Sequence, residues 1–154
     1  MHPHPLRRGP TVALAIVVSS LFWAAAPTAG LAAGALAVAL PPDVAKGGFS
    51  YGYANDKTDP DTASSRALEL CRTTKDAAND PKLRNLCKVI LNYSDKCIAV
   101  AMDPAAGTPG VGWAVATDRR SAEHDALIKC EATAGAGREA ACEISHSDCD
   151  GSAQ

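Results

Sequence analysis

The feature that most constrains the fold is an internal repeat, because two parts of the chain carry the same motifs in the same order. In each copy, a glycine–aromatic–alanine triplet precedes an alanine-rich segment that ends at a cysteine, and two further cysteines follow. The spacing differs between the copies, as expected when insertions and deletions fall in loops. We therefore predict a duplicated domain. The matched segments are Gly52-Tyr53-Ala54 with Gly112-Trp113-Ala114, Ala67-Leu68-x-x-Cys71 with Ala126-Leu127-x-x-Cys130, Cys87 with Cys142, and Cys97 with Cys149.

Each copy is expected to form two strands, a helix and a third strand. Turn residues separate the first two apolar runs, and apolar positions at helical spacing follow. The expected strands are 35–40, 49–54, 87–93, 97–102, 111–116 and 142–146, with helices over 62–75 and 119–134. Asp61 and either Thr117 or Asp118 are the expected helix N-caps. This order predicts an α+β fold, with an antiparallel sheet, two helices and an approximate twofold relation between the copies.

Large and small side chains alternate along the predicted strands. Successive strand residues point to opposite faces, so each strand has a bulky face and a nearly smooth one. In the second strand the bulky residues are Phe49, Tyr51 and Tyr53, and Gly52 and Ala54 lie between or beside them. We expect both helices to cover one face of the sheet. Their alanine-rich stripes favour the bulky face, although the pattern leaves the choice of face open.

Six cysteines in a domain of this size are typical of three disulfides where the domain lies in an oxidising compartment. In both copies a cysteine near the helix end and one opening the next strand are placed for a local bond. A bond from Cys87 to Cys97 is disfavoured, because six strand residues separate them by roughly 20 Å and disulfide Cα atoms lie within about 7 Å. The remaining bond is expected to join the two copies, because its cysteines occupy matched positions. The predicted bonds are Cys71–Cys87, Cys130–Cys142 and Cys97–Cys149.

The beginning of the chain has the order of a secretory signal peptide: two arginines, an uncharged apolar segment, and small residues up to Ala32. The alternative is a membrane anchor, because residues 11–40 carry no charge and are long enough to span a bilayer. Cleavage is favoured because helix-weakening glycine and proline interrupt this segment and the repeat begins before Ala37. We expect a signal peptide over 1–32, a single duplicated domain over 33–154, and a secreted or periplasmic protein.

The charge of the mature chain limits its partners. Removing Arg7 and Arg8 from the 15 basic residues leaves 13 against 17 acidic ones, a net charge of −4. A mildly acidic domain without a basic run is a poor binder of nucleic acid or of anionic membranes. We expect a protein or cell-envelope partner, no nucleic acid, and no stable membrane insertion after signal cleavage.

The sequence contains no glycine-rich phosphate loop, nucleophile elbow, HExxH motif or paired-carboxylate motif. Glu123, His124 and Asp125 are neighbours on the second helix, so they point in different directions and are expected on a solvated face. Cys142, His146 and Cys149 are alternative metal ligands, but their spacing is not a standard zinc pattern. We predict no catalytic residue, no cofactor and no metal.

Several motifs together resemble one bacterial family. They are the alanine-rich first strand, the glycine–aromatic second strand, a helix ending Ala-x3-Cys, "CKV" at the start of a strand, and a later "C-x-A-V-A". The family is the exported one known as domain of unknown function 4189, and the resemblance covers about Gly34 to Cys149. It implies a small exported bacterial domain and brings no established activity or catalytic residue. This chain departs from the family in its long "TTKDAANDPKLRN" connection between Cys71 and Cys87.

Two hypotheses of function follow. The first is a non-catalytic interaction module whose partner surface includes Phe49, Tyr51, Tyr53 and Trp113, because exposed apolar patches mark partner sites. The alternative role for these aromatic residues is core packing. The second hypothesis is a small hydrolase-like enzyme, in which His124 or His146 meets a carboxylate from the other copy.

Overall fold

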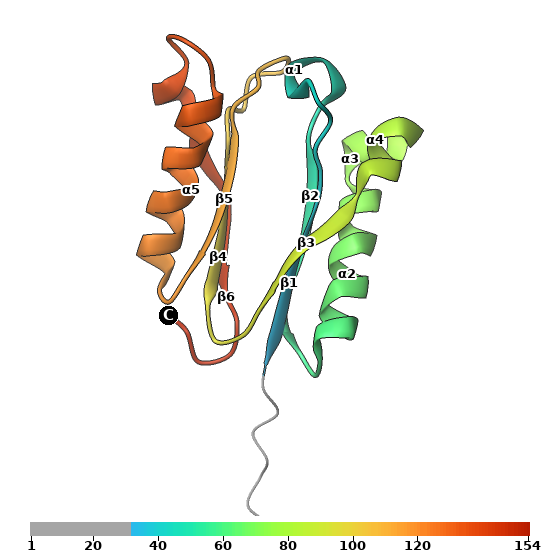
Figure 1. Ribbon diagram of the computed structural model, residues 1–154, viewed down its shortest axis with the longest axis vertical. Coiled ribbons are helices and arrows are strands. Elements are labelled where there is room, and N and C mark those ends of the chain that lie inside the picture. The colour runs from blue at the N-terminus through green and yellow to red at the C-terminus, as the bar shows by residue number, and fades with distance from the viewer. Residues whose placement is uncertain (1–31) are drawn as a thin grey trace, which may run out of the picture.

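A computed structural model describes residues 32–154 of the chain. The predicted signal peptide lies outside the described residues, except for Ala32, and so does the choice between cleavage and anchoring. Figure 1 shows the described chain as two sheets that face each other, with a helical layer on the outer side of each. Within residues 32–154, no helix is long and apolar enough to cross a membrane.

Each sheet has three antiparallel strands, and all three come from one copy of the repeat. The first sheet has the order β2-β1-β3 and the second has the order β5-β4-β6. The strands are β1 (Ala33–Ala39), β2 (Ser50–Lys57), β3 (Lys88–Tyr93), β4 (Cys97–Met102), β5 (Val111–Ala116) and β6 (Glu143–Cys149). The two central strands, β1 and β4, are therefore counterparts.

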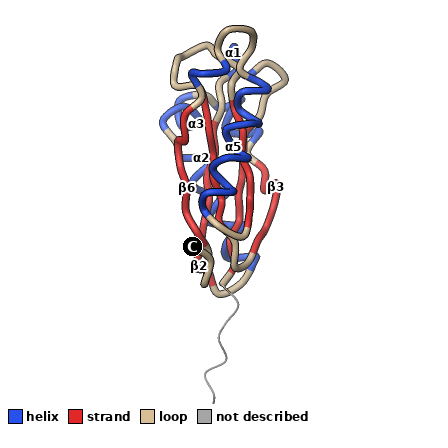
Figure 2. Tube along the Cα trace, turned by 90° about the vertical axis from the view of Figure 1, so that its left-hand side faces the viewer, coloured by secondary structure: helices blue, strands red, loops and turns tan. Residues whose placement is uncertain are grey.

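Two long helices follow the second strand of each copy. They are α2 (Pro60–Thr73) and α5 (Arg119–Thr133), and Figure 2 shows α5 in front of the strands. Asp118 is the N-cap of α5, as predicted, but Asp59 rather than Asp61 caps α2, because its carboxylate accepts from the Thr62 N–H. The shorter helices are α1 (Val44–Gly47), α3 (Lys75–Asn79), α4 (Pro81–Leu86) and the 3-10 turn η1 (Glu139–Ala141).

The predicted α+β class, the antiparallel pairing and the duplicated unit are confirmed. The expected single sheet with both helices on one face is not found in the described chain. Each copy instead forms its own three-stranded sheet, and its own helix covers that sheet. The physical reason is that each sheet has a bulky face that one alanine-rich helix cannot cover. Packing the two bulky faces together removes both from water.

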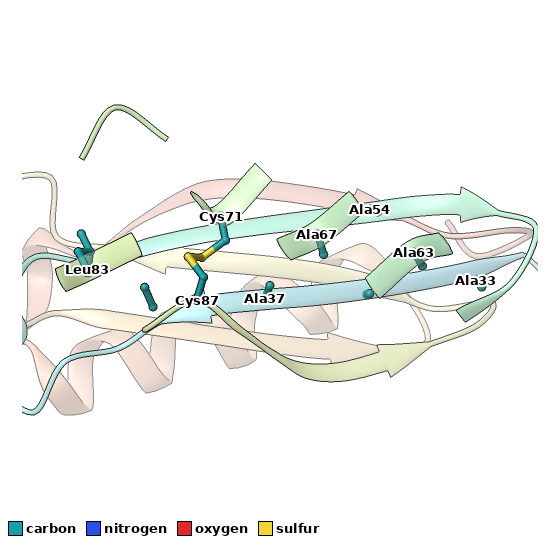
Figure 3. Close-up of a cluster of buried hydrophobic side chains, with 10 residues drawn as sticks. Ala33, Ala37, Ala54, Ala63, Ala67, Cys71, Leu83 and Cys87 are labelled. Carbon is teal, nitrogen blue, oxygen red and sulfur yellow. A yellow bond between two sulfur atoms is a disulfide. The ribbon is translucent and has the colours of Figure 1, made fainter. Parts of the chain in front are cut away.

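The inner core lies between the sheets and consists of the bulky strand residues. Leu36, Val38, Ile98 and Val100 of the two central strands are at most 1% exposed there. The helices cover the other, smooth faces, so the preference for the bulky face is wrong. Figure 3 shows this for the first copy, where Ala63 and Ala67 of α2 lie over the alanine face of the sheet.

Two glycines explain why the smooth face suits the helices. A Cβ atom built on Gly52 would lie 2.3 Å from the Ala67 carbonyl oxygen and the Cys71 nitrogen. One built on Gly112 would lie 2.4 Å from the same backbone atoms of Ala126 and Cys130. Each helix therefore contacts its strand backbone to backbone, and only glycine leaves room for that approach.

The strand registers define which residues of the two copies correspond. An irregularity lies between Leu36 and Ala37 where β1 pairs with β3, and between Val100 and Ala101 where β4 pairs with β6. Just before it, Leu36 pairs with Leu91, and Val100 pairs with His146. Leu91 and His146 are therefore counterparts. On the other side, Leu36 pairs with Tyr53 and Val100 with Trp113, so these two aromatic residues are also counterparts.

The structure contains the three disulfides that the cysteine spacing predicts, and every described cysteine is bonded. Cys71–Cys87 joins α2 to the start of β3 (Figure 3), and Cys130–Cys142 does the same for α5 and β6. The expectation that Cys97–Cys149 joins the copies is wrong, because these residues pair directly across β4 and β6 of one sheet. Their counterparts in the first copy are Ala33 and Ser94, so the two cysteines do not occupy matched positions.

A buried carboxylate near the C-terminus connects the two copies instead. Asp150 is 0% exposed and accepts from the Asp56 N–H at 2.7 Å and the Asp95 N–H at 3.3 Å. The carboxylates of Asp56 and Asp95 in turn accept from the N–H groups of Gly151 and Ser152. These reciprocal hydrogen bonds fasten the chain after β6 to the first copy.

Candidate functional site

The seam between β2 and β6 brings polar and aromatic side chains of both copies together. The Tyr53 ring stacks on the His146 ring, with centroids 3.8 Å apart and planes 24° apart. The hydroxyls of Tyr51 and Ser145 lie 2.8 Å apart. We call these four residues the polar seam. It is a contact between the sheets that the residue order does not reveal, because β2 and β6 belong to different copies.

Burial decides the electrostatics of the polar seam. The pKa of His146 is lowered mainly by burial, which disfavours the charged imidazolium; nearby Asp148 acts in the opposite direction and Arg119 in the same one. The pKa of Tyr53 is raised, again mainly by burial, with the Asp148 charge adding to it. The His146 Nε2 atom is buried and has no hydrogen-bond partner among the described residues. The seam therefore holds a neutral histidine at neutral pH.

Among the described residues, the positions equivalent to Tyr53 and His146, each in the other copy, hold apolar side chains. The counterparts of Tyr53 and His146 are Trp113 and Leu91, as the registers show. Tryptophan and leucine thus stand at the positions equivalent to the tyrosine and histidine that stack in the seam. Both exchanges make the two copies chemically different there, and His146 is the titratable residue that one of them introduces.

Neither histidine meets the requirement of the hydrolase hypothesis. His146 stacks on an aromatic ring of the other copy, and His124 is exposed on α5. Across residues 32–154, no hydrogen bond or ion pair joins either histidine to a carboxylate. Glu123 is half-buried while His124 and Asp125 are exposed, so these three neighbours do not converge on one point.

The metal alternative does not fit the sulfur chemistry. Cys142 is bonded to Cys130 and Cys149 to Cys97, so neither sulfur is a thiolate that can ligate a metal. In the described part of the chain, no group of three or more histidine, cysteine, aspartate or glutamate side chains could hold a metal ion. His146 is left without the ligands that the sequence places beside it.

The structure divides the predicted aromatic surface into core and half-buried residues. Phe49 is only 7% exposed and stacks against both Tyr51 and Trp113, with centroids 5.9 Å and 6.2 Å away. Tyr51, Tyr53 and Trp113 are half-buried. All four side chains belong to the packing between the sheets, and three of them reach its rim.

An apolar hollow lies beside Trp113, at the end of the molecule where α1 is found (Figure 1). Its volume is about 470 Å³. Leu40, which lines it, is 43% exposed and lies next to other apolar residues of the hollow, and contiguous exposed apolar groups mark partner sites. We call it the Trp113 hollow. Its lining residues are Leu40, Pro41, Pro42, Asp43, Val44, Pro109, Val111, Trp113 and Thr133.

The residue pattern does not indicate most of this hollow, nor the ion pair between Arg138 and Asp103. The Nε and Nη2 atoms of the Arg138 guanidinium donate to the two oxygens of the Asp103 carboxylate, each at 2.6 Å. These hydrogen bonds hold the pKa of Asp103 below its usual range and tie the β4–β5 turn to the segment after α5. Pro41, Pro42 and Pro109 line the hollow, and the two proline-containing turns that hold them are the sequence signal that could have located it.

Comparison with known families bears on the whole duplicated unit. The family model described as "Domain of unknown function (DUF4189)" matches residues 33–149. The chain belongs to the DUF4189 family. The match spans both copies of the repeat and all six cysteines, so the duplicated, disulfide-bonded unit described above is this chain's DUF4189 domain. No curated protein and no solved structure matches the chain.

Proposed function

We propose that this DUF4189 protein is an exported, non-catalytic interaction module that binds a protein or cell-envelope partner at the Trp113 hollow. The observation that carries the proposal is the hollow itself: a concave apolar site rimmed by Leu40, which is 43% exposed. Exposing such groups costs free energy unless a partner covers them. The three disulfides support a site of action in an oxidising compartment.

The hydrolase alternative has less support from the geometry. General acid–base catalysis needs a histidine within hydrogen-bond reach of a group that orients or activates it. His146 is instead held by ring stacking with Tyr53. A histidine in that position contributes packing to the seam rather than a proton to a substrate.

Site-specific photo-crosslinking tests the proposed module. The photoreactive amino acid p-benzoylphenylalanine replaces Leu40 at the hollow or, as a control, exposed Ser65 on α2. The protein is expressed and irradiated in the producing cells. We expect a discrete crosslinked product from position 40 and none from position 65. A His124→Ala change should leave that product intact.

Two results would contradict the proposal. One is an equal set of crosslinked products at positions 40 and 65, which would show only random contact. The other is a product at position 40 that persists when a Val44→Asp change puts a charge into the hollow. Val44 is half-buried and lines the hollow, so a partner that binds there should be lost.

A further inference from the structure

The outer edge of β5 is closed by side chains of α5. The Thr133 hydroxyl lies 2.9 Å from the Val111 nitrogen and 2.8 Å from its carbonyl oxygen. The Lys129 ammonium group donates to the Trp113 carbonyl oxygen at 3.0 Å. The backbone N–H and C=O groups of Val111 and Trp113 therefore point away from β4, and side chains of α5 form hydrogen bonds with several of them. This protects an exposed edge from pairing with another strand.

The edge of β2 has the same geometry. Tyr51 and Tyr53 pair with Val38 and Leu36, just as Val111 and Trp113 pair with Met102 and Val100. The equivalent register directs their backbone N–H and C=O groups to the outer edge, because these groups alternate along an antiparallel strand. β2 is an edge strand, so no strand of the described chain pairs with it there.

The side chains that close the β5 edge are missing at β2. Gly52 packs on Leu70 and Cys71 as Gly112 packs on Lys129 and Cys130, so Leu70 is the counterpart of Lys129. Thr74, the counterpart of Thr133, directs its hydroxyl to the Ser50 hydroxyl at 2.7 Å. Among residues 32–154, no side chain bonds to the backbone of Tyr51 or Tyr53. The β2 edge is thus open where the β5 edge is closed.

A hollow of about 390 Å³ runs beside this open edge. The counterpart hollow beside β5 is about 310 Å³, and it differs because its lining residues Lys129 and Thr133 already bond to the strand backbone. Its walls are the strand backbone on one side and α2 on the other, with Leu70 as the apolar wall and Thr73 and Thr74 as hydroxyl groups. We call it the β2 groove. The full lining is Tyr51, Gly52, Tyr53, Leu70, Thr73 and Thr74.

We propose that the β2 groove binds an extended peptide segment of a partner protein, which adds to the first sheet as a fourth strand. An extended backbone is the ligand that complements alternating N–H and C=O groups, and this mode of recognition takes its specificity from alternate side chains. The peptide side chains that face α2 would contact Leu70, and they should therefore be small or apolar. The proposal rests on the function proposed above, because it assigns a second surface and a ligand class to the same module.

The test transfers to the first copy the lysine that caps the β5 edge in the second copy, where Lys129 donates to the Trp113 carbonyl oxygen. Leu70→Lys places a lysine where Lys129 stands at β5, within reach of the Tyr53 carbonyl oxygen. Lysine is tolerated at that place in α5, so the fold should persist, and the disulfide pattern of the purified variant checks this. Ser65→Lys adds the same charge at an exposed position of the same helix and is the control.

The probe is a peptide selected from a phage-displayed library of random dodecapeptides against the oxidised protein, purified in the form that the producing cells contain. We expect a selected peptide to bind the Leu70→Lys variant about tenfold more weakly or worse, as the loss of one or two backbone hydrogen bonds predicts. The Ser65→Lys variant should bind it like the wild type. In the wild type, the peptide should slow hydrogen exchange at the Tyr51 and Tyr53 amides, as measured by NMR.

Several outcomes would overturn the proposal. The first is a failure to select any peptide. The second is a selected peptide that binds the Leu70→Lys variant as tightly as it binds the wild type. The third is a bound peptide that does not slow hydrogen exchange at the Tyr51 and Tyr53 amides. The amide measurement holds even if Leu70→Lys disturbs the fold. A wild-type dimer in sedimentation that Leu70→Lys dissociates would show that a second copy of the chain, not a peptide, occupies the groove. Crosslinking at position 40 reports on the Trp113 hollow and not on the β2 groove. The proposed interaction module can therefore be correct even if the peptide-binding proposal for the β2 groove is wrong.

Discussion

His146 occupies a place that the first copy fills with Leu91, and this difference puts a titratable ring into the seam. Its ring is stacked on Tyr53, and burial lowers its pKa. Because the folded state holds the neutral form more strongly than the unfolded state does, the unfolded chain binds more protons below the unfolded pKa of about 6.5. The contribution of His146 to stability is therefore complete above that pH and is lost as the pH falls through it.

Replacing His146 by the leucine of the other copy tests this assignment. The melting temperature of the wild type should fall between pH 7.5 and pH 5.5, and His146→Leu should flatten that fall, because the variant has no group there to protonate. Differential scanning calorimetry at several pH values measures both slopes. His124→Gln removes an exposed histidine and should keep the wild-type slope. Equal slopes for wild type and His146→Leu would show that other groups cause the pH dependence.

At the scale of elements, each copy is a helix laid against the smooth face of its own sheet. Alanine on the helix and glycine on the strand let the two backbones approach, so the contact has little side-chain area but close packing. Close packing of this kind tolerates added atoms poorly, because backbone atoms cannot move aside as a flexible side chain can. Gly52 and Gly112 are the points of closest approach.

Gly52→Ala and Gly112→Ala should each destabilise the domain by about 2 kcal/mol or more, as overpacking against backbone predicts. The control is Gly137→Ala, whose added Cβ meets nothing within 4 Å, although its φ of +80° disfavours alanine. That backbone strain alone should cost about 1 kcal/mol. Urea unfolding curves of the oxidised proteins give the comparison. A glycine variant at 52 or 112 that is more stable than Gly137→Ala would mean that the helix does not lie on the strand as described.

At the scale of the whole molecule, disulfides act within copies and non-covalent contacts act between them. The three bonds each join residues of one copy, with sequence separations of 16, 52 and 12. The copies are joined by the core between the bulky sheet faces, the polar seam and the hydrogen bonds of Asp150. The two copies are therefore held together by buried side chains and hydrogen bonds, and not by disulfides.

The longest loop predicts the most stabilising disulfide. In the chain-entropy model, the Cys97–Cys149 loop of 52 residues contributes about 4 kcal/mol and the Cys71–Cys87 loop of 16 about 3 kcal/mol. Replacing Cys97 and Cys149 by serine should therefore lower the melting temperature at least as much as replacing Cys71 and Cys87. Non-reducing peptide maps should show the other two bonds unchanged. A smaller loss in the first double variant would mean that the β4–β6 pairing already restrains this loop when the chain unfolds.

The residue pattern was enough to predict the duplicated unit, the order of its six strands and two long helices, and the three cysteine pairs, but not the short helices α1, α3 and α4. These features depend on local periodicity and on distances along the chain, which a strand–helix–strand unit converts into space in a regular way. Phe49, Tyr51, Tyr53 and Trp113 were also correctly grouped, because strand alternation places them on one kind of face. Their distribution between the core and its rim was beyond the reach of the pattern.

The way in which the two copies pack together could not be read from the residue pattern. Whether the bulky faces receive helices or each other depends on the total apolar area to be buried and on the backbone approach at Gly52 and Gly112, neither of which is a local property. The same choice places His146 on Tyr53, makes Cys97–Cys149 a bond within one sheet, and leaves the β2 edge open beside Leu70. Each of these contacts joins residues whose relation is set by packing, because their separation along the chain does not fix their distance in space.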